Sequence, residues 1–392
     1  MVKIKKVKIL GIGPILDLEI EFNDHFNIIC GQNGVGKTTI LDCLSQSFAG
    51  SSSSLKKTAA LERGSWTVDV LINGLTAQKT FDTVLFIPTN TSRNRNGFYE
   101  NSNDIIVFKT QRDIPYVNLN NLSKDSAKEI HQFASETIGG SLSTNLKNWF
   151  VNRYLFSAQP KGLNDNQRKN YELAKKCFNI LNPEVSFSRV LVSSFDIMLN
   201  TENGEIYFEY LSSGYKSCLA VLLGLINELE LRYTDPSKYI KDFDGIVFID
   251  EIDLHLHPEW QAKMYWTLKE ILPNAQLFIS THSPHILQVA QPREIIPLIL
   301  DDNRRIKINP IVNQEFGLQG WTVEEVLKDV MGMSETRSDT YLDIIANCNK
   351  ALDEENYKEA KTIIDILDRM LHPENSLRKI LKIQLAGLSD DD

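Results

Sequence analysis

Apolar and polar residues alternate along the N-terminal part of the chain in the way that β-strands require. The alternation runs over Lys3–Leu10 and over Leu16–Phe22, and glycine and proline separate the two runs. A period of two places one face of a strand on the core and the other in solvent. We therefore predict a β-hairpin here, followed by two more strands over Trp66–Ile72 and Gln78–Phe86.

Farther along the chain, the pattern changes to buried strands and amphipathic helices. Continuous apolar runs predict strands over Phe26–Cys30, Gly245–Ile249 and Gln276–Ser280. From Ser213 onward helices alternate with strands, which is typical of an α/β fold. Helical spacing predicts helices over Lys37–Leu44, Lys124–Ile138 with Ser123 as N-cap, Leu142–Phe156, Asn164–Ile180 and Cys218–Leu231, and about three amphipathic helices over Thr322–Leu388.

Composition limits the class of protein. The chain has 392 residues, enough for two or three domains, and a net charge of −9 that argues against general coating of nucleic acid. No apolar run approaches the roughly 18–20 residues of a membrane span. The five cysteines are scattered and form no C-x-x-C pair. We therefore expect a cytoplasmic protein with reduced thiols and no membrane partner.

The segment Gly31–Thr39, directly after the first buried strand, carries the most specific chemistry. Its Gly-x-x-x-x-Gly-Lys-Thr spacing is that of a phosphate-binding loop, in the required order of strand, loop and helix. Glycines let successive backbone N–H groups point at phosphate oxygens, and the helix N-terminus attracts the anion. Lys37 is expected to reach the β- and γ-phosphates, and Thr38 to supply a hydroxyl ligand to Mg²⁺. The predicted nucleotide-binding residues are Gly31, Asn33, Gly34, Gly36, Lys37, Thr38 and Thr39.

Two later strands end in residues that such a loop needs. Asp250 ends the strand Gly245–Ile249, where it is placed to hold Mg²⁺, and Glu251 is the natural base or orienting group for attacking water. His282 follows the strand Gln276–Ser280, where a polar side chain can contact the γ-phosphate. The predicted catalytic residues are Glu251, His282 and Lys37, the predicted metal ligands are Thr38 and Asp250, and the predicted cofactors are ATP and Mg²⁺.

A third motif, Leu211-Ser212-Ser213-Gly214, precedes the long apolar helix. Serine and glycine at a helix N-terminus offer a hydroxyl and free N–H groups to an anion. The same string is also a common N-cap, so it gains weight only from its place upstream of the carboxylate strand. Ser212, Ser213 and Gly214 are therefore added to the predicted nucleotide-binding residues.

Together these motifs resemble the ABC-type ATPases of the SMC, RecF and OLD branch. The runs Asp250–Pro258 and Ser280–Pro284 are typical of its smaller defence-associated members, and the resemblance spans Lys3–Val289. The tail from Gly320 onward is similar to the helical C-terminus of the ATPase subunit in Septu-type antiphage systems and of related retron-associated ATPases.

The resemblance implies an α/β ATPase head, a mixed sheet with flanking helices, that carries a helical insert and a C-terminal helical region. Four parts are expected: an N-terminal ATPase lobe with the phosphate loop over 1–122, the helical insert over 123–183, an ATPase lobe with the signature, the carboxylate strand and His282 over 184–310, and a helical partner-docking region over 311–392.

The resemblance also implies a site shared between subunits. In this family the signature loop of one subunit caps the ATP held by the phosphate loop of another, so a homodimer or a higher homo-oligomer is expected. ATP would join the subunits, hydrolysis would release them, and turnover would be slow or regulatory. His255 and His257 would then lie at the D-loop along the dimer interface, which we favour over a zinc site for this pair.

Three features depart from the family pattern. Ser213 and Gly214 stand where a glycine pair is usual, and Tyr215 replaces the common glutamine or glutamate of the signature. No glutamine is evident in the Q-loop that we expect after Leu85–Ile87, where Asn90 or Arg93 stands instead. No sustained heptads occur between the phosphate-loop helix and the signature, so no long coiled-coil arm is expected.

The leading hypothesis is an ATP-gated sensor and scaffold in bacterial antiphage defence. It would control an effector nuclease of the HNH type, or a retron component, on another chain, because no nuclease cluster follows His282 in the sequence. The acidic helical tail is either a docking surface for that partner or a domain cap. The alternative is a RecF-like ATP-dependent DNA clamp in repair. Its nucleic-acid contacts would come from Arg93, Arg95, Lys161, Arg168 and Lys169, which are otherwise solvated loop charges.

Overall fold

The computed structural model describes residues 1–50, 53–91, 97–112, 114–141, 145–312 and 315–388. They form two compact units, Met1–Gly332 and Met333–Asp392. The four-part division expected from the sequence is finer than these two units and stays a prediction. Across the described ranges, no helix combines the length and the apolar composition that crossing a bilayer requires.

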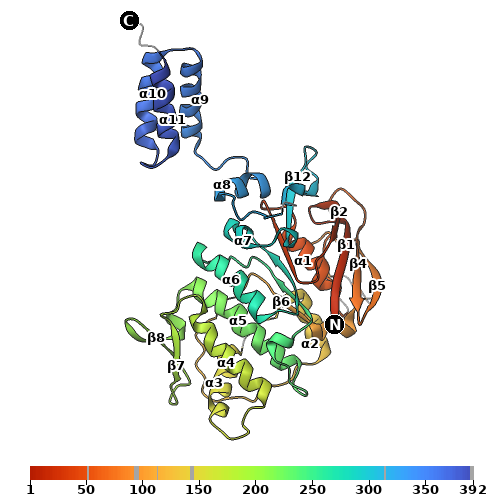
Figure 1. The fold of residues 1–392 in the computed structure, drawn as a ribbon. Helices are drawn as coiled ribbons and strands as arrows, with labels where there is room; N and C mark the ends of the chain where they lie inside the picture. The colour runs from red at the N-terminus through yellow and green to blue at the C-terminus, as the bar shows by residue number, and fades with distance from the viewer. Residues whose placement is uncertain (51–52, 92–96, 113, 142–144, 313–314, 389–392) are drawn as a thin grey trace. The chain divides into compact units, whose positions relative to one another are not determined.

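A six-stranded mixed sheet forms the centre of the first unit (Figure 1). Its strand order is β13-β12-β3-β11-β10-β6, and every neighbouring pair is parallel except β12 and β13. The strands are β3 (Phe26–Gly31), β6 (Ile105–Phe108), β10 (Ile246–Ile249), β11 (Gln276–Ser280), β12 (Ile295–Leu300) and β13 (Ile306–Ile308). The three apolar runs form strands as predicted, and the α/β fold class is confirmed. Strand β6 is not predicted from the sequence, because four apolar residues are too few to reveal a period.

The main sheet is buried on both faces, and its strands alternate between two cores. Ile28 and Cys30 face a core shared with the covering helices, whereas Ile29 between them faces a core shared with a second sheet. Strand β10 shows the same alternation. Strands covered on both faces read as continuous apolar runs, which explains why these runs identify them. Because a slip of one residue would exchange the two faces, the register and the residues at the strand ends are fixed.

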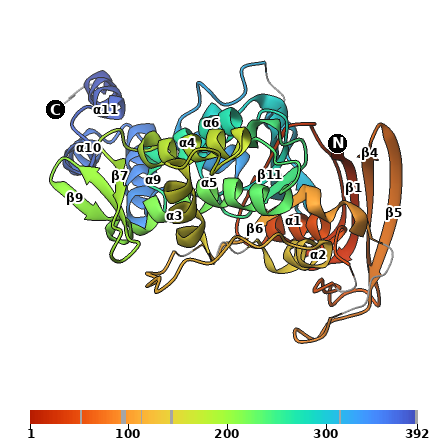
Figure 2. The ribbon, with the colours of Figure 1, turned by 90° about the horizontal axis from the view of Figure 1, so that it is seen from below.

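The second sheet is antiparallel, has the order β2-β1-β4-β5, and lies across α1 (Lys37–Gln46) from the main sheet. Its strands are β1 (Val2–Ile12), β2 (Ile15–Glu21), β4 (Gly64–Ile72) and β5 (Leu75–Thr83). Helix α1 packs against β1 on one side and against β3 and β11 on the other, between the two sheets (Figure 2). The predicted hairpin is confirmed. Strand β5 ends at Thr83 and not at Phe86, because Val84 and Phe86 are exposed and have no core to face.

Helices cover the other face of the main sheet (Figure 1). They are α3 (Leu146–Ser157), α4 (Asp165–Ile180), α5 (Ser213–Arg232), α6 (Pro258–Ile271) and α7 (Pro284–Val289). Helix α2 (Ile130–Gly139) packs instead against the edge strand β6 and against α1. A small antiparallel sheet follows α4 and consists of β7 (Ser186–Val190), β8 (Ile197–Thr201) and β9 (Gly204–Tyr207). Helix α4 begins as predicted after Asn164, whose side chain accepts a hydrogen bond from Gln167 N (2.9 Å).

Helix α2 begins later than the sequence pattern predicts. Its N-cap is Glu129 and not Ser123. The backbone of Ser123 is held by α3: its N–H donates to Asn148 Oδ1 (3.0 Å), and its carbonyl accepts from Asn148 Nδ2 (3.0 Å) and Asn152 Nδ2 (2.8 Å). These side-chain bonds hold the chain extended before α2, and they override the local capping signal.

The second unit is a group of three helices, α9 (Asp339–Asp353), α10 (Tyr357–Met370) and α11 (Ser376–Gly387). Before it, still in the first unit, come the short helix α8 (Val323–Glu325) and the π-turn η6 (Val326–Val330). The predicted helices over Thr322–Leu388 are confirmed. Among the described residues of the second unit, the buried apolar ones are few: Tyr341, Cys348, Ala351, Ala360, Ile364, Leu367 and Leu381.

Candidate nucleotide-binding site

The carboxyl ends of neighbouring strands meet at one edge of the main sheet. The phosphate loop follows β3, Asp250 and Glu251 follow β10, and His282 follows β11, which lies between those two strands. Residues that follow adjacent parallel strands lie close together at the sheet edge, where ligands bind in α/β folds. The structure thus brings together the strand-end residues that the sequence predicts from segments more than two hundred positions apart.

Three glycines shape the phosphate loop. Gly31, Gly34 and Gly36 have φ values of 140°, 81° and 86°, which side-chain-bearing residues rarely adopt. A Cβ on Gly31 would lie 2.3 Å from the carbonyl oxygen of Leu298, so the loop can pass this strand only with glycine. Gly36 is the N-cap of α1, whose first N–H groups are therefore free for an anion.

Lys37 and Thr38 begin α1 and occupy different surroundings. Lys37 is buried, and its Nζ donates to the carbonyls of Gly31 (3.0 Å) and Gln32 (2.9 Å). Burial lowers the pKa of Lys37 below its ordinary value, although the nearby carboxylates oppose this. Thr38 Oγ1 lies 3.2 and 3.1 Å from the two carboxylate oxygens of Asp250. A hydroxyl and a carboxylate side by side are oxygen donors of the kind that Mg²⁺ prefers.

The remaining loop residues predicted to bind nucleotide divide into two groups. Asn33 and Gly34 are exposed, and a Cβ on Gly34 would meet no atom within 4 Å, so this part of the loop borders open space. Thr39 is turned toward the β1–β2 hairpin, where its Oγ1 lies 3.2 Å from the position of a Cβ on Gly13. The hairpin therefore supports the loop from one side.

Ser280, the last residue of β11, joins the two carboxylate-bearing positions. Its hydroxyl donates to Asp250 Oδ1 (2.6 Å) and accepts from the backbone N–H of Glu251 (2.7 Å). Asp250 is only 5% exposed, so these bonds fix a buried carboxylate. Sequence reasoning misses Ser280, although a single hydroxyl at the end of an apolar strand is a visible signal.

Glu251 follows in an unusual backbone conformation. Its φ is 47°, in the left-handed region, and a terminal nitrogen of Arg112 donates to its carbonyl oxygen. Arg112 comes from the segment after β6, the strand paired with β10. The same segment carries Gln111. The expectation that Asn90 or Arg93 stands in the Q-loop stays a prediction, and Arg93 lies outside the described residues.

His282 is held by a residue that sequence reasoning also misses. The carboxylate of Asp253 accepts from His282 N (3.1 and 3.3 Å) and from Thr281 Oγ1 (2.6 Å). Burial, and then the positive charge of Lys37, lower the pKa of His282 below its ordinary value of 6.5. The imidazole is therefore neutral at pH 7 and can act as a hydrogen-bonding group toward a phosphate.

The signature residues lie apart from this cluster. Ser212 is the N-cap of α5, and its Oγ accepts from Tyr215 N (3.3 Å). Ser212 and Ser213 are exposed, whereas a Cβ on Gly214 would lie 2.1 Å from the carbonyl oxygen of His255. Within the described residues, no hydrogen bond joins Ser212–Gly214 to the phosphate loop. One copy of the chain thus brings the phosphate loop, the carboxylates after β10 and His282 together, whereas the signature serines face solvent.

Tyr215, the departure from the family signature, is a core residue. It is 3% exposed, its ring packs edge-on against Trp260, and its hydroxyl donates to the carbonyl of Phe178. Its large ring fills the space between α5, α6 and the end of α4, which a glutamine could not do.

The residues of the alternative site predictions lie elsewhere. His257 is the N-cap of α6, and within the described ranges no cluster of three or more histidine, cysteine, aspartate or glutamate side chains could hold a metal. Arg93 and Arg95 lie outside the described residues, and Lys161 is exposed. Arg168 and Lys169 border a surface groove in which acidic side chains alternate with basic ones, which weakens attraction for a phosphate backbone.

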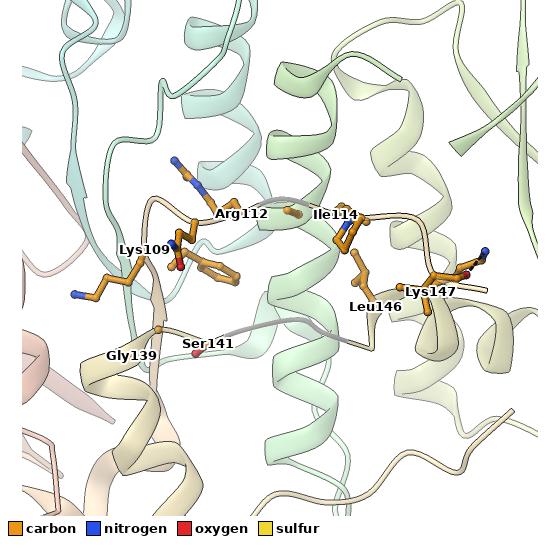
Figure 3. A pocket seen from close by; sticks show the side chains of 13 residues that line it. Lys109, Arg112, Ile114, Gly139, Ser141, Leu146 and Lys147 are labelled. Atoms are coloured by element: carbon orange, nitrogen blue, oxygen red, sulfur yellow. Dashed lines mark hydrogen bonds between the residues drawn. The ribbon is translucent and has the colours of Figure 1, made fainter. Parts of the chain in front are cut away.

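A cavity of about 280 Å³ lies beside the segment that follows β6 (Figure 3). It is lined by Gln111, Arg112, Gly140, Ser141, Leu146 and Lys147, among others. No residue of the phosphate loop and neither carboxylate of β10 lines it, so it is distinct from the candidate site.

Comparison with known proteins identifies the family. A family model described as an AAA ATPase domain matches residues 72–287, more than half of the chain. A Septu protein PtuA of Bacillus thuringiensis is 44% identical over 393 residues, which cover 98% of each chain. A retron Vc95 probable ATPase of Vibrio cholerae serotype O1 biovar El Tor is 33% identical over 31% of this chain and 23% of its own.

Solved structures with a similar fold include SMC head domains. The head bound to the C-winged helix domain of ScpA has a TM-score of 0.46 at 17% identity, over 78% of this chain and 97% of its own. The SMC head domain from Thermotoga maritima has a TM-score of 0.43 at 16% identity, over 78% and 98%. On the full-length similarity to the Bacillus thuringiensis protein, the chain belongs to the PtuA family of Septu proteins and carries an ATPase domain.

Proposed function

We propose that this chain hydrolyses ATP at a site completed by a second copy, and that the nucleotide state gates an effector nuclease on another chain in cytoplasmic antiphage defence. The observation that carries the proposal is the convergence of three strand ends. Lys37 and Thr38 after β3, Asp250 and Glu251 after β10, and His282 after β11 meet at one sheet edge.

Phosphate binding falls to the loop and to α1. The backbone N–H groups of the loop, the N-terminus of α1 and the Lys37 ammonium are the donors for the phosphate oxygens. Thr38 and Asp250 would hold Mg²⁺, which would offset the negative charge of the phosphates. Ser280 keeps the Asp250 carboxylate in place through its hydrogen bond.

Hydrolysis requires a base and an orienting group for water. Glu251 orients the water and accepts its proton. The water oxygen bonds to the γ-phosphorus while the bond from phosphorus to the β–γ bridging oxygen breaks, and ADP and phosphate leave. Neutral His282 donates a hydrogen bond to the γ-phosphate, which stabilises the charge that the reaction redistributes. We expect slow turnover, because one copy alone leaves the site incomplete.

A second copy supplies the missing donors. The exposed Ser212 and Ser213, with the free N–H groups at the start of α5, form an anion-binding helix terminus. Two copies related by a two-fold axis would each cap the nucleotide of the other, since such an interface pairs the same two surfaces twice.

Coupling to a partner is supported by where the first unit ends. Its last residue, Gly332, has a φ of 73°, and a Cβ there would lie 3.2 Å from Nε2 of Gln32 in the phosphate loop. The π-turn η6 precedes it, and such turns frequently mark functional sites. A change at Gln32 on nucleotide binding would therefore reach Gly332, the last residue of the first unit. We assign the C-terminal helices that follow in the sequence to partner docking.

ATP turnover by the purified chain tests the hydrolytic part. Wild type should hydrolyse ATP, Lys37→Ala should lose both binding and turnover, and Glu251→Gln should retain ATP and shift the chain to a larger assembly. Turnover that neither substitution changes would contradict the proposed site.

Gating is tested by recovery of partners from the native host. The Glu251→Gln variant, purified with ATP, should bring down a nuclease or a retron component, and Lys37→Ala should bring down a different amount. Recovery of no nuclease, reverse transcriptase or nucleic acid with either variant would contradict the gating role. Recovery of nucleic acid alone would support the RecF-like clamp in its place.

A further inference from the structure

Arg112 links the strand next to β10 with the turn that carries the proposed base. The β6–β10 ladder continues past the strands, since Asp250 N donates to the carbonyl of Phe108 (2.9 Å). A few residues later Arg112 returns to this turn and donates from a terminal nitrogen to the carbonyl of Glu251. In Figure 3 its side chain extends away from Gly139 and Ser141, which lie on the opposite wall of the cavity.

The backbone that Arg112 reaches is strained. A φ of 47° is unfavourable at a glutamate and persists only where the surroundings impose it. Here the peptide groups on both sides of Glu251 are held: its N–H donates to Ser280 Oγ (2.7 Å), and its carbonyl accepts from Leu254 N (2.9 Å) and from Arg112. The guanidinium is the one side-chain donor to this carbonyl among the described residues, and together the three bonds fix the direction in which the Glu251 side chain leaves the backbone.

The surroundings of Arg112 are not those of a structural arginine. Arg112 is only 8% exposed, and its Nε has no hydrogen-bond partner. Among the described residues, the carbonyl of Glu251 is the one hydrogen-bond acceptor for its side chain. Arg232 is also buried with an unpaired Nε, but its terminal nitrogens meet the carboxylates of Glu136 (2.6 Å) and Glu228 (3.4 Å). An unpaired buried donor is destabilising, and among the described residues no ion pair of Arg112 offsets that cost.

We propose that Arg112 is a positioning residue for ATP hydrolysis, which holds the left-handed turn at Glu251 so that its carboxylate faces the attacking water. This inference rests on the proposed function of Glu251 as the base. It also means that movement of the segment after β6 changes the base directly, because the guanidinium joins the two. Burial lowers the pKa of the Arg112 guanidinium from its ordinary value, and the negative charges of Asp250, Asp253 and Glu251 oppose this.

The test compares Arg112→Lys, Arg112→Gln and Arg112→Ala with wild type, with Glu251→Gln and with the matched control Arg232→Lys. Each variant is assayed for kcat, for KM, for the affinity of a non-hydrolysable ATP analogue and for melting temperature. We expect the Arg112 variants to lower kcat by about 10- to 100-fold, the effect of a small misplacement of a catalytic group. KM and analogue affinity should stay within about twofold, because the donors to the phosphates are untouched. Millimolar guanidinium should restore part of the kcat of Arg112→Ala, since it can take the place of the Arg112 side chain at the Glu251 carbonyl.

The outcomes separate this inference from the proposed function. If wild type and Glu251→Gln turn over ATP equally, the proposed function fails. If Glu251→Gln is inactive but kcat is unchanged in the Arg112 variants, only the positioning role fails. The role also fails if kcat, analogue affinity and melting temperature fall together, as expected for Arg232→Lys. Should Arg112→Ala not fold, Arg112→Gln decides the question, because its amide is nearly the right length and keeps a donor.

Discussion

The unit Met1–Gly332 and the unit Met333–Asp392 are built on cores of very different size. The first contains two extensive apolar clusters on the two faces of one sheet, and its proposed chemistry lies at the edge of that sheet. The second encloses seven buried apolar residues among those described, and leaves Ile366, Met370, Ile380 and Ile383 exposed. A small domain has little stability to spare. The first unit therefore has the core needed to fix catalytic side chains in place, whereas the second exposes apolar side chains that suit the partner docking we propose.

The largest expected effect separates chemistry from folding in the first unit. Lys37→Ala should reduce ATP turnover by about 10²- to 10³-fold, because a preorganised donor to the transferred phosphate is lost. Its unfolding free energy should not fall, since the ammonium is buried at a cost and its partners are backbone carbonyls. Steady-state turnover and chemical denaturation measure the two quantities.

Lys361→Ala in the second unit, an exposed position, is the matched control and should change neither quantity. If Lys37→Ala lowers the unfolding free energy as well as ATP turnover, the contrast between the two units fails, because one residue would then serve both chemistry and stability.

The next expected effect is a loss of stability in the second unit without a loss of ATP turnover. Leu367→Ala should cost about 2–5 kcal/mol of unfolding free energy. A unit of this size has only about 3–5 kcal/mol available, so its helices should unfold. ATP turnover should persist, since Leu367 belongs to the second unit alone. Hydrogen exchange of α10, read beside turnover in the same sample, checks both expectations.

Ile383→Ala provides the control for that substitution. Ile383 is 72% exposed, so the change should stay within about 0.5 kcal/mol. Loss of ATP turnover in Leu367→Ala, with retention in Ile383→Ala, would mean that the two units do not fold independently.

A smaller effect distinguishes the two serines of the signature. Ser212→Ala should destabilise the first unit by about 1 kcal/mol, because Ser212 caps α5. Ser213→Ala should change stability by less than about 0.5 kcal/mol, because its exposed side chain caps nothing in its own chain. Denaturant melts give both numbers. Equal losses of unfolding free energy in the two variants would show that Ser213 also stabilises the fold of a single copy.

The smallest effect concerns pH. Because the folded pKa of His282 lies below its ordinary value of 6.5, the unfolded chain takes up a proton that the folded chain refuses. The stability due to neutral His282 is therefore complete above pH 6.5 and is lost as pH falls below it. His282→Asn should flatten this part of the stability profile between pH 7.5 and 5.5, whereas the exposed His372→Asn should not. Identical profiles of stability against pH for wild type and His282→Asn would contradict the lowered pKa of His282.

Much of the site could be predicted from the sequence because its backbone requirements leave visible marks. Glycine at Gly31 and Gly36, and carboxylates after an apolar strand, are local signals of a conformation or a burial. Ser280, Arg112 and Asp253 could not be assigned, because each acts through a contact with a residue far away in the chain. Strand β6 was missed for a different reason, since it is too short to show a period. The false N-cap at Ser123 was overridden by asparagines of α3.

The central claim is that one copy of the chain cannot complete its own ATP site, and mixing two inactive variants tests it most directly. Lys37→Ala removes the phosphate-loop half, and Ser213→Arg blocks the signature half at an exposed position that the fold does not need. Each variant alone should lack turnover. Random pairing of equal amounts should restore about a quarter of wild-type turnover, because half of the two-fold dimers then contain one intact site of two. Mixtures that remain inactive, or a Ser213→Arg variant that hydrolyses ATP normally by itself, would contradict a shared site.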